Sequence, residues 1–148
     1  MMKICKRFSD IPFAHRQPKH DGHCKLVHGH NWSVELEFES DELDENGFVL
    51  DFGKFKKVKK WIADHLDHAI VVDQEDELLK KLVFEEHPEL FKPLVVPLPS
   101  CEGLAMFLYN KFKEVLEEDF PRLKSGEIRF SAIRMWEDSK NYVVYEPK

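Results

Sequence analysis

The sequence predicts an α+β domain in which a four-stranded antiparallel sheet carries two helices on one face. The predicted elements follow the order strand, strand, helix, helix, strand, strand. Strand pairs that flank consecutive helices are typical of an antiparallel sheet covered by helices. In addition, 43% of the 148 residues are hydrophobic, which is enough to build one buried core. Because no repeat, low-complexity tract or Gly/Ser linker interrupts the chain, we expect a single domain over residues 1–148.

The second strand is the clearest element of the sequence. Residues 31–39, NWSVELEFE, alternate strictly between apolar and polar side chains, which is the pattern of a half-buried strand. The apolar face holds Trp32, Val34, Leu36 and Phe38, and the polar face holds Ser33, Glu35, Glu37 and Glu39. An opening strand is expected between residues 3 and 14. After the second strand, Asn46–Gly47 followed by the apolar run 48–50 predicts a hairpin.

Two amphipathic helices are predicted in the middle of the chain. Asp51 is expected to cap the first helix, which should end near Asp67, and Ser100 is expected to cap the second. Both segments repeat apolar residues at helical spacing: Phe55, Val58, Trp61, Ile62, His65 and Leu66, then Leu104, Ala105, Leu108, Phe112, Val115 and Leu116. Residues 73–99 contain an acidic patch and four prolines and are predicted to be loop with a short helix. Strands at residues 127–136 and 142–145 complete the order.

Charge and composition argue against several classes of protein. The chain has 22 basic and 28 acidic residues, a formal net charge of -6, which does not suit a surface that neutralises nucleic-acid phosphates. No apolar run approaches the roughly 20 residues that span a bilayer, and no signal peptide is evident. We therefore expect a cytoplasmic protein without nucleic-acid or membrane partners. Three widely spaced cysteines do not suggest a disulfide framework, and Cys5 and Cys101 are expected to be ordinary buried or semi-buried thiols.

Histidines concentrate in one short segment. Residues 23–31, HCKLVHGHN, contain three of the eight histidines and one of the three cysteines. His28 and His30 lead directly into the alternating strand, so both imidazoles should lie on its apolar face with Trp32. A neutral imidazole there needs a partner, and zinc accepts neutral imidazole nitrogens. A third ligand must come from elsewhere, and His15, in the apolar context PFAHR, is the best candidate.

The remaining residues near this segment leave alternatives open. An isolated H-x-H is more often a surface or hydrogen-bonded pair than a metal site, and His20 and His23 in the polar stretch PKHDGH are expected to be exposed. Cys24 shifts the balance toward a metal site. It could be a fourth ligand that closes a structural site, or a free thiolate that acts as base or nucleophile. Spacing alone does not separate these two roles.

Several motifs in order along the chain carry a family resemblance. FAHR, HDGHCKLVHGHN, GFVLDFGKFKK, LDHA, PSCEGLA and RMWEDSKNYVVYE together closely resemble the 6-pyruvoyltetrahydropterin synthase and 6-carboxytetrahydropterin synthase family. This resemblance implies the tunnelling fold, in which the sheets of several subunits join around a barrel and active sites form between neighbouring chains. It also implies a homo-oligomer, a trimer or a hexamer.

The resemblance also implies roles for particular residues. The zinc ligands would be His15, His28 and His30. The residues that transfer protons would be Cys24, Asp67 and His68. The residues that anchor the pterin would be Glu137 and, with a less defined role, Glu102. Without the resemblance, Asp67–His68 would suggest only a helix-end cap, and Glu137 a surface residue at a strand end. Arg16, Lys19 and Lys25 are candidates for contacting a triphosphate.

The function implied by the resemblance is a zinc-dependent lyase. Its substrate would be 7,8-dihydroneopterin triphosphate. We favour the branch that forms 6-carboxytetrahydropterin, with release of triphosphate and acetaldehyde, in queuosine and 7-deazaguanine biosynthesis, because the compact chain and the HDGHCKLVHGHN loop are closer to it. The alternatives are a 6-pyruvoyltetrahydropterin synthase of the tetrahydrobiopterin pathway and a non-catalytic zinc-stabilised module. An aldolase of this family is disfavoured by Cys24, because such members tend to carry a glutamate near that position.

Overall fold

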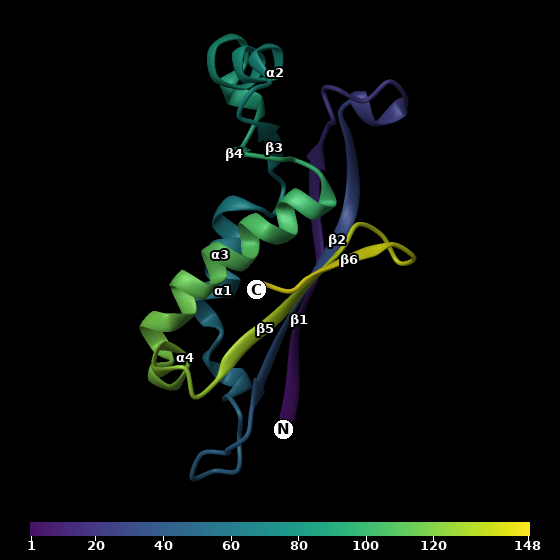
Figure 1. The fold of residues 1–148 in the computed structure, drawn as a ribbon. Coiled ribbons are helices and arrows are strands. Elements are labelled where there is room, and N and C mark those ends of the chain that lie inside the picture. Colours follow the sequence, from purple (N-terminus) through teal and green to yellow (C-terminus); the bar gives the residue numbers. More distant parts are fainter.

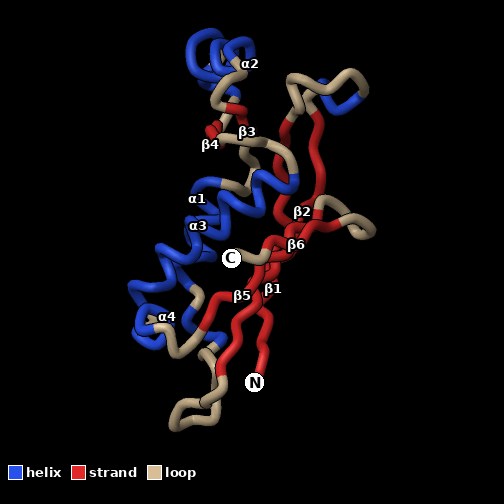
Figure 2. Tube along the Cα trace, in the orientation of Figure 1, coloured by secondary structure: helices blue, strands red, loops and turns tan.

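A computed structural model describes residues 1–148 and shows one mixed sheet of six strands with its two longest helices on one face (Figures 1 and 2). The strand order is β4-β3-β1-β2-β5-β6. The four predicted strands are present as β1 (Met2–His15), β2 (His28–Ser40), β5 (Arg129–Trp136) and β6 (Tyr142–Tyr145). Neighbours among these four are antiparallel. The α+β class is confirmed.

The sheet is not limited to four antiparallel strands, and this part of the prediction was wrong. β3 (Ile70–Asp73) and β4 (Pro93–Val96) pair in parallel, and β3 is also parallel to β1. All four residues of β3 are buried. Strands that are covered on both faces show no alternation, which explains why β3 gave no strand signal. β4 lies at the edge of the sheet and is only partly buried, but it is four residues long and begins with a proline.

Two main helices cover one face of the sheet. α1 (Lys56–His65) and α3 (Cys101–Asp119) lie on the same side of the long strands in Figure 1. Ser100 caps α3, as predicted, by accepting a hydrogen bond from the backbone N–H of Gly103. The large core between helices and sheet includes Trp32, Leu36, Leu108 and Phe112. Two shorter helices are α2 (Glu77–Lys81) and α4 (Pro121–Ser125). Leu123 of α4 belongs to the large core, whereas Leu79 of α2 packs with Ile70 and Val72 of β3 in a separate cluster. None of the helices is long and apolar enough to cross a membrane.

The segment between β2 and α1 differs from the predicted hairpin. Residues 48–50 form no strand. Instead, the carboxylate of Asp44 accepts hydrogen bonds from the backbone N–H groups of Asn46 and Phe48, and Gly47 has a positive φ of 81°. Asp51 caps a single 3₁₀ turn (Phe52–Lys54), so α1 begins later than expected, and it ends two residues before Asp67.

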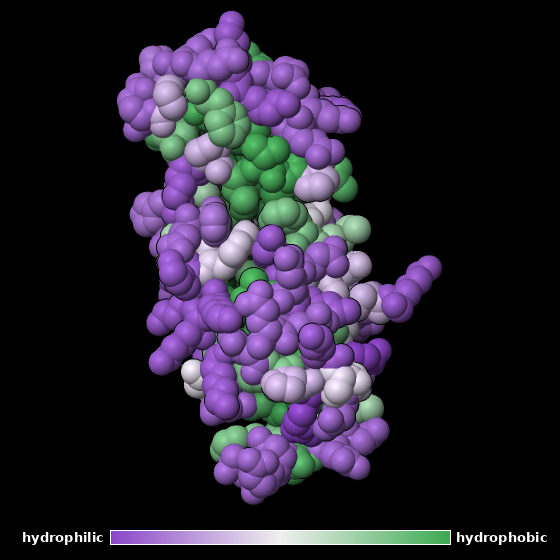
Figure 3. Space-filling view, turned by 90° about the vertical axis from the view of Figure 1, so that its left-hand side faces the viewer, coloured by the Kyte–Doolittle hydropathy of each residue, from purple (hydrophilic) through white to green (hydrophobic).

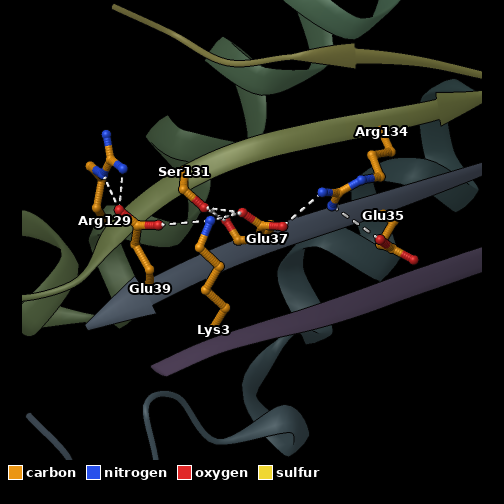
Figure 4. A network of polar contacts seen from close by, with 7 residues as sticks. All are labelled: Lys3, Glu35, Glu37, Glu39, Arg129, Ser131 and Arg134. Carbon is orange, nitrogen blue, oxygen red and sulfur yellow. Dashed lines mark hydrogen bonds and ion pairs between the residues drawn. The ribbon is translucent and has the colours of Figure 1, made fainter. Parts of the chain in front are cut away.

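The face of the sheet away from the helices carries a charged network (Figure 4). Its members are Lys3, Glu35, Glu37, Glu39, Arg129, Ser131 and Arg134. Glu37 and Glu39 are buried although their strand position predicted a polar face. The reason is that cross-strand arginines and Lys3 lie over the carboxylates. We call these seven residues the charged network below. Cys5, which was expected to be at least partly buried, is exposed on this face.

The helical side of the molecule is mostly hydrophilic, with hydrophobic side chains gathered in its upper half (Figure 3). A shallow cavity of about 270 Å³ lies on this side, between the start of α3 and residues 97–98. Leu98 and Met106 line it and are among the exposed large apolar residues.

Candidate active site

Three histidines meet where β1 ends and β2 begins. The strand register pairs His15 with His28 and Phe13 with His30. One ring nitrogen from each of the three histidines can be chosen such that all three atoms lie within 4.8 Å of one another. His15 is buried, and His28 and His30 are half-buried. The structure therefore brings together the three histidines that were predicted as metal ligands.

A bulge in β1 places His15 in this cluster. Before the bulge, even-numbered residues such as Ile4 and Phe8 face the helices, and after it the odd-numbered Ile11 and Phe13 do so. The register shifts between Phe8 and Ile11, where Asp10 has a positive φ of 59°. One extra residue in a strand reverses the faces of everything that follows it. Without the bulge, the His15 imidazole would lie on the opposite face of the sheet.

Backbone carbonyls orient two of the imidazoles. Nδ1 of His15 lies 2.7 Å from the Pro99 carbonyl oxygen, and Nδ1 of His28 lies 2.7 Å from that of Leu26. Because a carbonyl oxygen only accepts, each Nδ1 carries the hydrogen and leaves the lone pair on Nε2. This is the arrangement that second-shell carbonyls impose on metal-binding histidines.

The Nε2 atoms of the cluster are suited to bind a metal ion. Those of His15 and His30 are buried and have no hydrogen-bond partner. Glu137 Oε1 lies 3.7 Å and 3.3 Å from them, a contact without hydrogen-bond geometry. Burial, reinforced by the nearby imidazoles of His28 and His30, lowers the pKa of His15 to about 4. The imidazole is therefore neutral near pH 7, and neutral imidazoles with free Nε2 lone pairs fit a divalent cation.

A cavity of about 490 Å³ opens beside the cluster. Its lining residues are His15, Gln17, Cys24, Ser100, Cys101, Glu102, Glu137, Asn141, Tyr142 and Val143. Predicted residues from three distant parts of the sequence therefore share one cavity. Cys24 is exposed on a 3₁₀ turn (His23–Lys25), and its sulfur is not part of the three-histidine group. His20 and His23 are exposed, as expected.

The Asp67–His68 pair lies apart from this cavity. Nδ1 of His68 is 2.7 Å from Oδ1 of Asp67, but the His68 side chain is 80% exposed. Asp67 lines a different cavity, with Lys6 and Arg7 among its walls. His68 has a positive φ of 62°, and its backbone N–H donates to the Pro12 carbonyl. Within one chain, this pair does not reach the residues that surround Cys24.

Sequence reasoning missed Cys101 as a cavity residue. Burial, followed by the negative charges of Glu137 and Glu102, raises the pKa of the Cys101 thiol to about 12. The thiol stays protonated and donates to the Met135 carbonyl, with Sγ and oxygen 3.3 Å apart. The available signal was its position beside Glu102 in the first turn of a capped helix. Asn141 and Tyr142 gave no signal of their own.

Comparison with known proteins identifies the family. The model of the 6-pyruvoyl tetrahydropterin synthase family matches residues 3–148. The chain is 32% identical to a 6-carboxy-5,6,7,8-tetrahydropterin synthase of Haemophilus influenzae, with 99% of both chains covered. It is 34% identical to the enzyme of that name from Rickettsia conorii, over 94% of this chain and 96% of that protein.

Solved structures share the fold at lower identity. An uncharacterized protein from Wolinella succinogenes has a TM-score of 0.82 at 21% identity, covering 99% of this chain and 98% of its own. A 6-pyruvoyl tetrahydropterin synthase from Plasmodium vivax has a TM-score of 0.70 at 17% identity, covering 100% and 99%. Together with the family match over nearly the whole sequence, these findings show that the chain belongs to the 6-pyruvoyl tetrahydropterin synthase family.

Proposed function

We propose that this protein is a zinc-dependent 6-carboxytetrahydropterin synthase. It would convert 7,8-dihydroneopterin triphosphate to 6-carboxytetrahydropterin with release of triphosphate and acetaldehyde, a step toward queuosine and other 7-deazaguanines. The observation that carries the proposal is one cavity that joins the edge of a three-histidine cluster to two cysteines and two glutamates. The names of the relatives that match over almost the whole chain favour this product.

The histidine cluster supplies the metal-binding part of the site. His15, His28 and His30 would hold zinc through their Nε2 atoms, with the Pro99 and Leu26 carbonyls fixing the first two rings. The buried, unpartnered Nε2 atoms of His15 and His30 support this assignment. When bound, zinc supplies a Lewis acid that polarises the side-chain oxygens of the substrate.

The remaining cavity residues suit binding and proton transfer. Cys24 is exposed at the cavity wall, where its sulfur can take a proton from a carbon of the substrate side chain. General bases of this kind contribute ~10²–10⁴-fold to rate. The Glu137 carboxylate can accept two parallel N–H hydrogen bonds from the guanidine-like edge of a pterin, which would fix the ring in register. Glu102 lies on the same wall and can assist that binding.

The separation of Asp67–His68 from this cavity supports an active site shared between chains. The His68 side chain is exposed and has no partner except Asp67, so a neighbouring subunit could receive it as an acid or base. The sheet also has edges that allow assembly: β6 lies at the end of the sheet, and β1 pairs with β3 only at Ala14. Unpaired strand edges favour pairing with another chain. We therefore propose a homo-oligomeric barrel, a trimer or a hexamer.

Product analysis separates the two branches of the family. Purified protein with zinc and 7,8-dihydroneopterin triphosphate should release acetaldehyde together with 6-carboxytetrahydropterin. Formation of 6-pyruvoyltetrahydropterin without acetaldehyde would assign the chain to the other branch instead.

A cysteine variant separates the enzyme from a zinc-stabilised module. Cys24→Ala should keep bound zinc and the folded state while turnover falls by ~10²–10⁴-fold. Cys5→Ala is the matched control, because Cys5 is also exposed but lies on the face of the sheet opposite to the histidine cluster. Loss of zinc and unfolding in Cys24→Ala, with Cys5→Ala unaffected, would show instead that the cysteine is a structural ligand.

A further inference from the structure

The turn that carries Cys24 has little packing of its own. None of the three residues of this 3₁₀ turn (His23–Lys25) is buried. Two contacts tie it to the end of β1. The backbone N–H of Gln17 donates to the Cys24 carbonyl at 2.6 Å, and Nη1 of Arg16 donates to the Lys25 carbonyl at 3.1 Å. The position of the Cys24 sulfur therefore depends on how firmly Arg16 itself is held.

Arg16 is held by a buried carboxylate. Its Nε and Nη2 donate to the two oxygens of Asp76 at 2.7 Å and 3.2 Å. The Asp76 side chain is 2% exposed, and that of Arg16 is 21% exposed. A guanidinium that forms two parallel hydrogen bonds to one carboxylate is fixed in direction as well as position. Such a geometry is worth more than an exposed surface pair.

Asp76 is linked by hydrogen bonds to α2 and lies next to the β3–β4 pair. Its carboxylate also accepts from the Leu79 N–H and so caps α2. Just before it, Gln74 donates through its backbone N–H to the Val96 carbonyl at the end of the parallel β3–β4 pair. The chain continues from β4 to Pro99, whose carbonyl orients His15. One excursion of the chain, residues 70–99, thus contacts both the proposed metal site and the Cys24 turn.

We propose that Arg16 and Asp76 are positioning residues that hold the Cys24 turn in place beside the histidine cluster. This inference rests on the proposed function, in which the Cys24 sulfur transfers protons. It also assigns Arg16 a different role from contact with the substrate triphosphate, since three of its N–H groups are already used within the chain.

The test compares Asp76→Asn with Glu75→Gln in the full-length chain. Asparagine keeps the helix-capping oxygen but removes the charge that fixes Arg16. Glu75 is the matched control, because it forms a neighbouring ion pair with Lys19 in which the side chains are 69% and 84% exposed. Arg16→Lys is a second variant that keeps the positive charge and loses the paired geometry.

Two measurements report the turn independently of activity. Limited trypsin digestion probes the bond after Lys25, and hydrogen exchange probes the backbone amides of residues 22–26. Asp76→Asn and Arg16→Lys should be cleaved faster and exchange faster than the wild type, whereas Glu75→Gln should match the wild type at both positions. Zinc content should be unchanged in all three variants.

Kinetics then test the consequence for catalysis. In Asp76→Asn and Arg16→Lys, kcat should fall roughly tenfold or more with little change in KM, because a displacement of ~1 Å at a reacting group can cost ~10²-fold. Variants whose cleavage and exchange match those of Glu75→Gln would overturn the proposal. So would a rise in KM at constant kcat in Arg16→Lys, which would place Arg16 on the triphosphate. If the wild type shows no turnover, the proposed function fails, while cleavage and exchange still decide whether Arg16 and Asp76 hold the Cys24 turn.

Discussion

The two faces of the sheet formed by β1 and β2 differ in whether their buried polar groups have hydrogen-bond partners. On the face away from the helices, Glu37 receives hydrogen bonds from Arg134, Ser131 and Lys3. On the helical face, the buried Nε2 atoms of His15 and His30 have no hydrogen-bond partner. Glu37 and the two histidines lie in the same sheet, and all three side chains are ionisable.

This difference separates polar groups that are satisfied within the chain from polar groups that are not. A buried polar atom without a partner costs free energy, so native proteins rarely keep one without a reason. The charged network needs nothing from outside the chain, because each of its buried carboxylates already has a cation. In the histidine cluster, two buried Nε2 atoms have no partner within the chain, and under the proposed function a cation would satisfy them. Measurements that add the cation, or remove one partner from the network, should therefore affect the two faces differently.

The largest effect should come from adding zinc. At a free zinc concentration ~10³ times the dissociation constant, binding should raise the free energy of unfolding by about 4 kcal/mol. Urea denaturation with and without zinc measures this gain. His30→Ala should abolish it, and Glu37→Gln should retain it in full. An equal zinc effect in the wild type and His30→Ala would place the metal elsewhere.

A smaller effect should follow from Glu37→Gln in zinc-free protein. We expect a loss of about 2 kcal/mol at neutral pH, since hydrogen bonds to a charged group are the ones removed. Burial raises the pKa of Glu37, but hydrogen bonds from Arg134, Ser131 and Lys3 outweigh burial and lower this pKa to about 2.

The pH dependence of that loss has a defined sign. Because the folded state holds the pKa of Glu37 below its ordinary value of 4.5, the stabilisation is complete above about pH 4.5 and disappears as the pH falls toward 2. Urea denaturation at a series of pH values should show the stability of the wild type converging on that of Glu37→Gln over this range. A gap that stays constant with pH would show that the carboxylate charge is not responsible.

The smallest effect should come from Ser131→Ala. Its hydroxyl lies 2.8 Å from Glu37 Oε1 and 3.2 Å from the Glu37 carbonyl oxygen. Because the hydroxyl has a single hydrogen, its loss removes the equivalent of one hydrogen bond, worth about 1 kcal/mol. The loss should shrink when Glu37 is already glutamine, because the two residues share one network. A double-mutant cycle by urea denaturation measures this coupling. Additive effects of the two substitutions would separate Ser131 from the network.

Local pattern was enough to predict much of the fold. The alternation in residues 31–39 predicted β2 and the shared face of His28 and His30, and Ser100 marked the start of α3. β3 gave no signal, because strands buried on both faces do not alternate, and β4 is a four-residue edge strand that begins with a proline. The hairpin at residues 46–50 was wrong because Asp44 closes that turn with its own side chain.

The histidine cluster of the candidate site was predictable from the sequence, because histidine itself indicates metal binding. His15 was chosen for its apolar neighbours, although the β1 bulge that brings it to the cluster shows in the sequence only as a change from even to odd apolar positions. The Arg16–Asp76 pair joins residues 60 positions apart. Its existence depends on the path of residues 70–99, which no short-range pattern records. The same holds for the burial of Glu37, since its partners come from other strands.

The most direct test of the account is X-ray absorption spectroscopy of the zinc-loaded, full-length protein. Three imidazole ligands with an unligated Cys24 predict a nitrogen shell at about 2.0–2.1 Å and no sulfur shell. Histidine outer-shell scattering should disappear in His30→Ala together with the bound metal. A sulfur shell at about 2.3 Å that is lost in Cys24→Ala would contradict the account, because the cysteine would then be a ligand rather than a base.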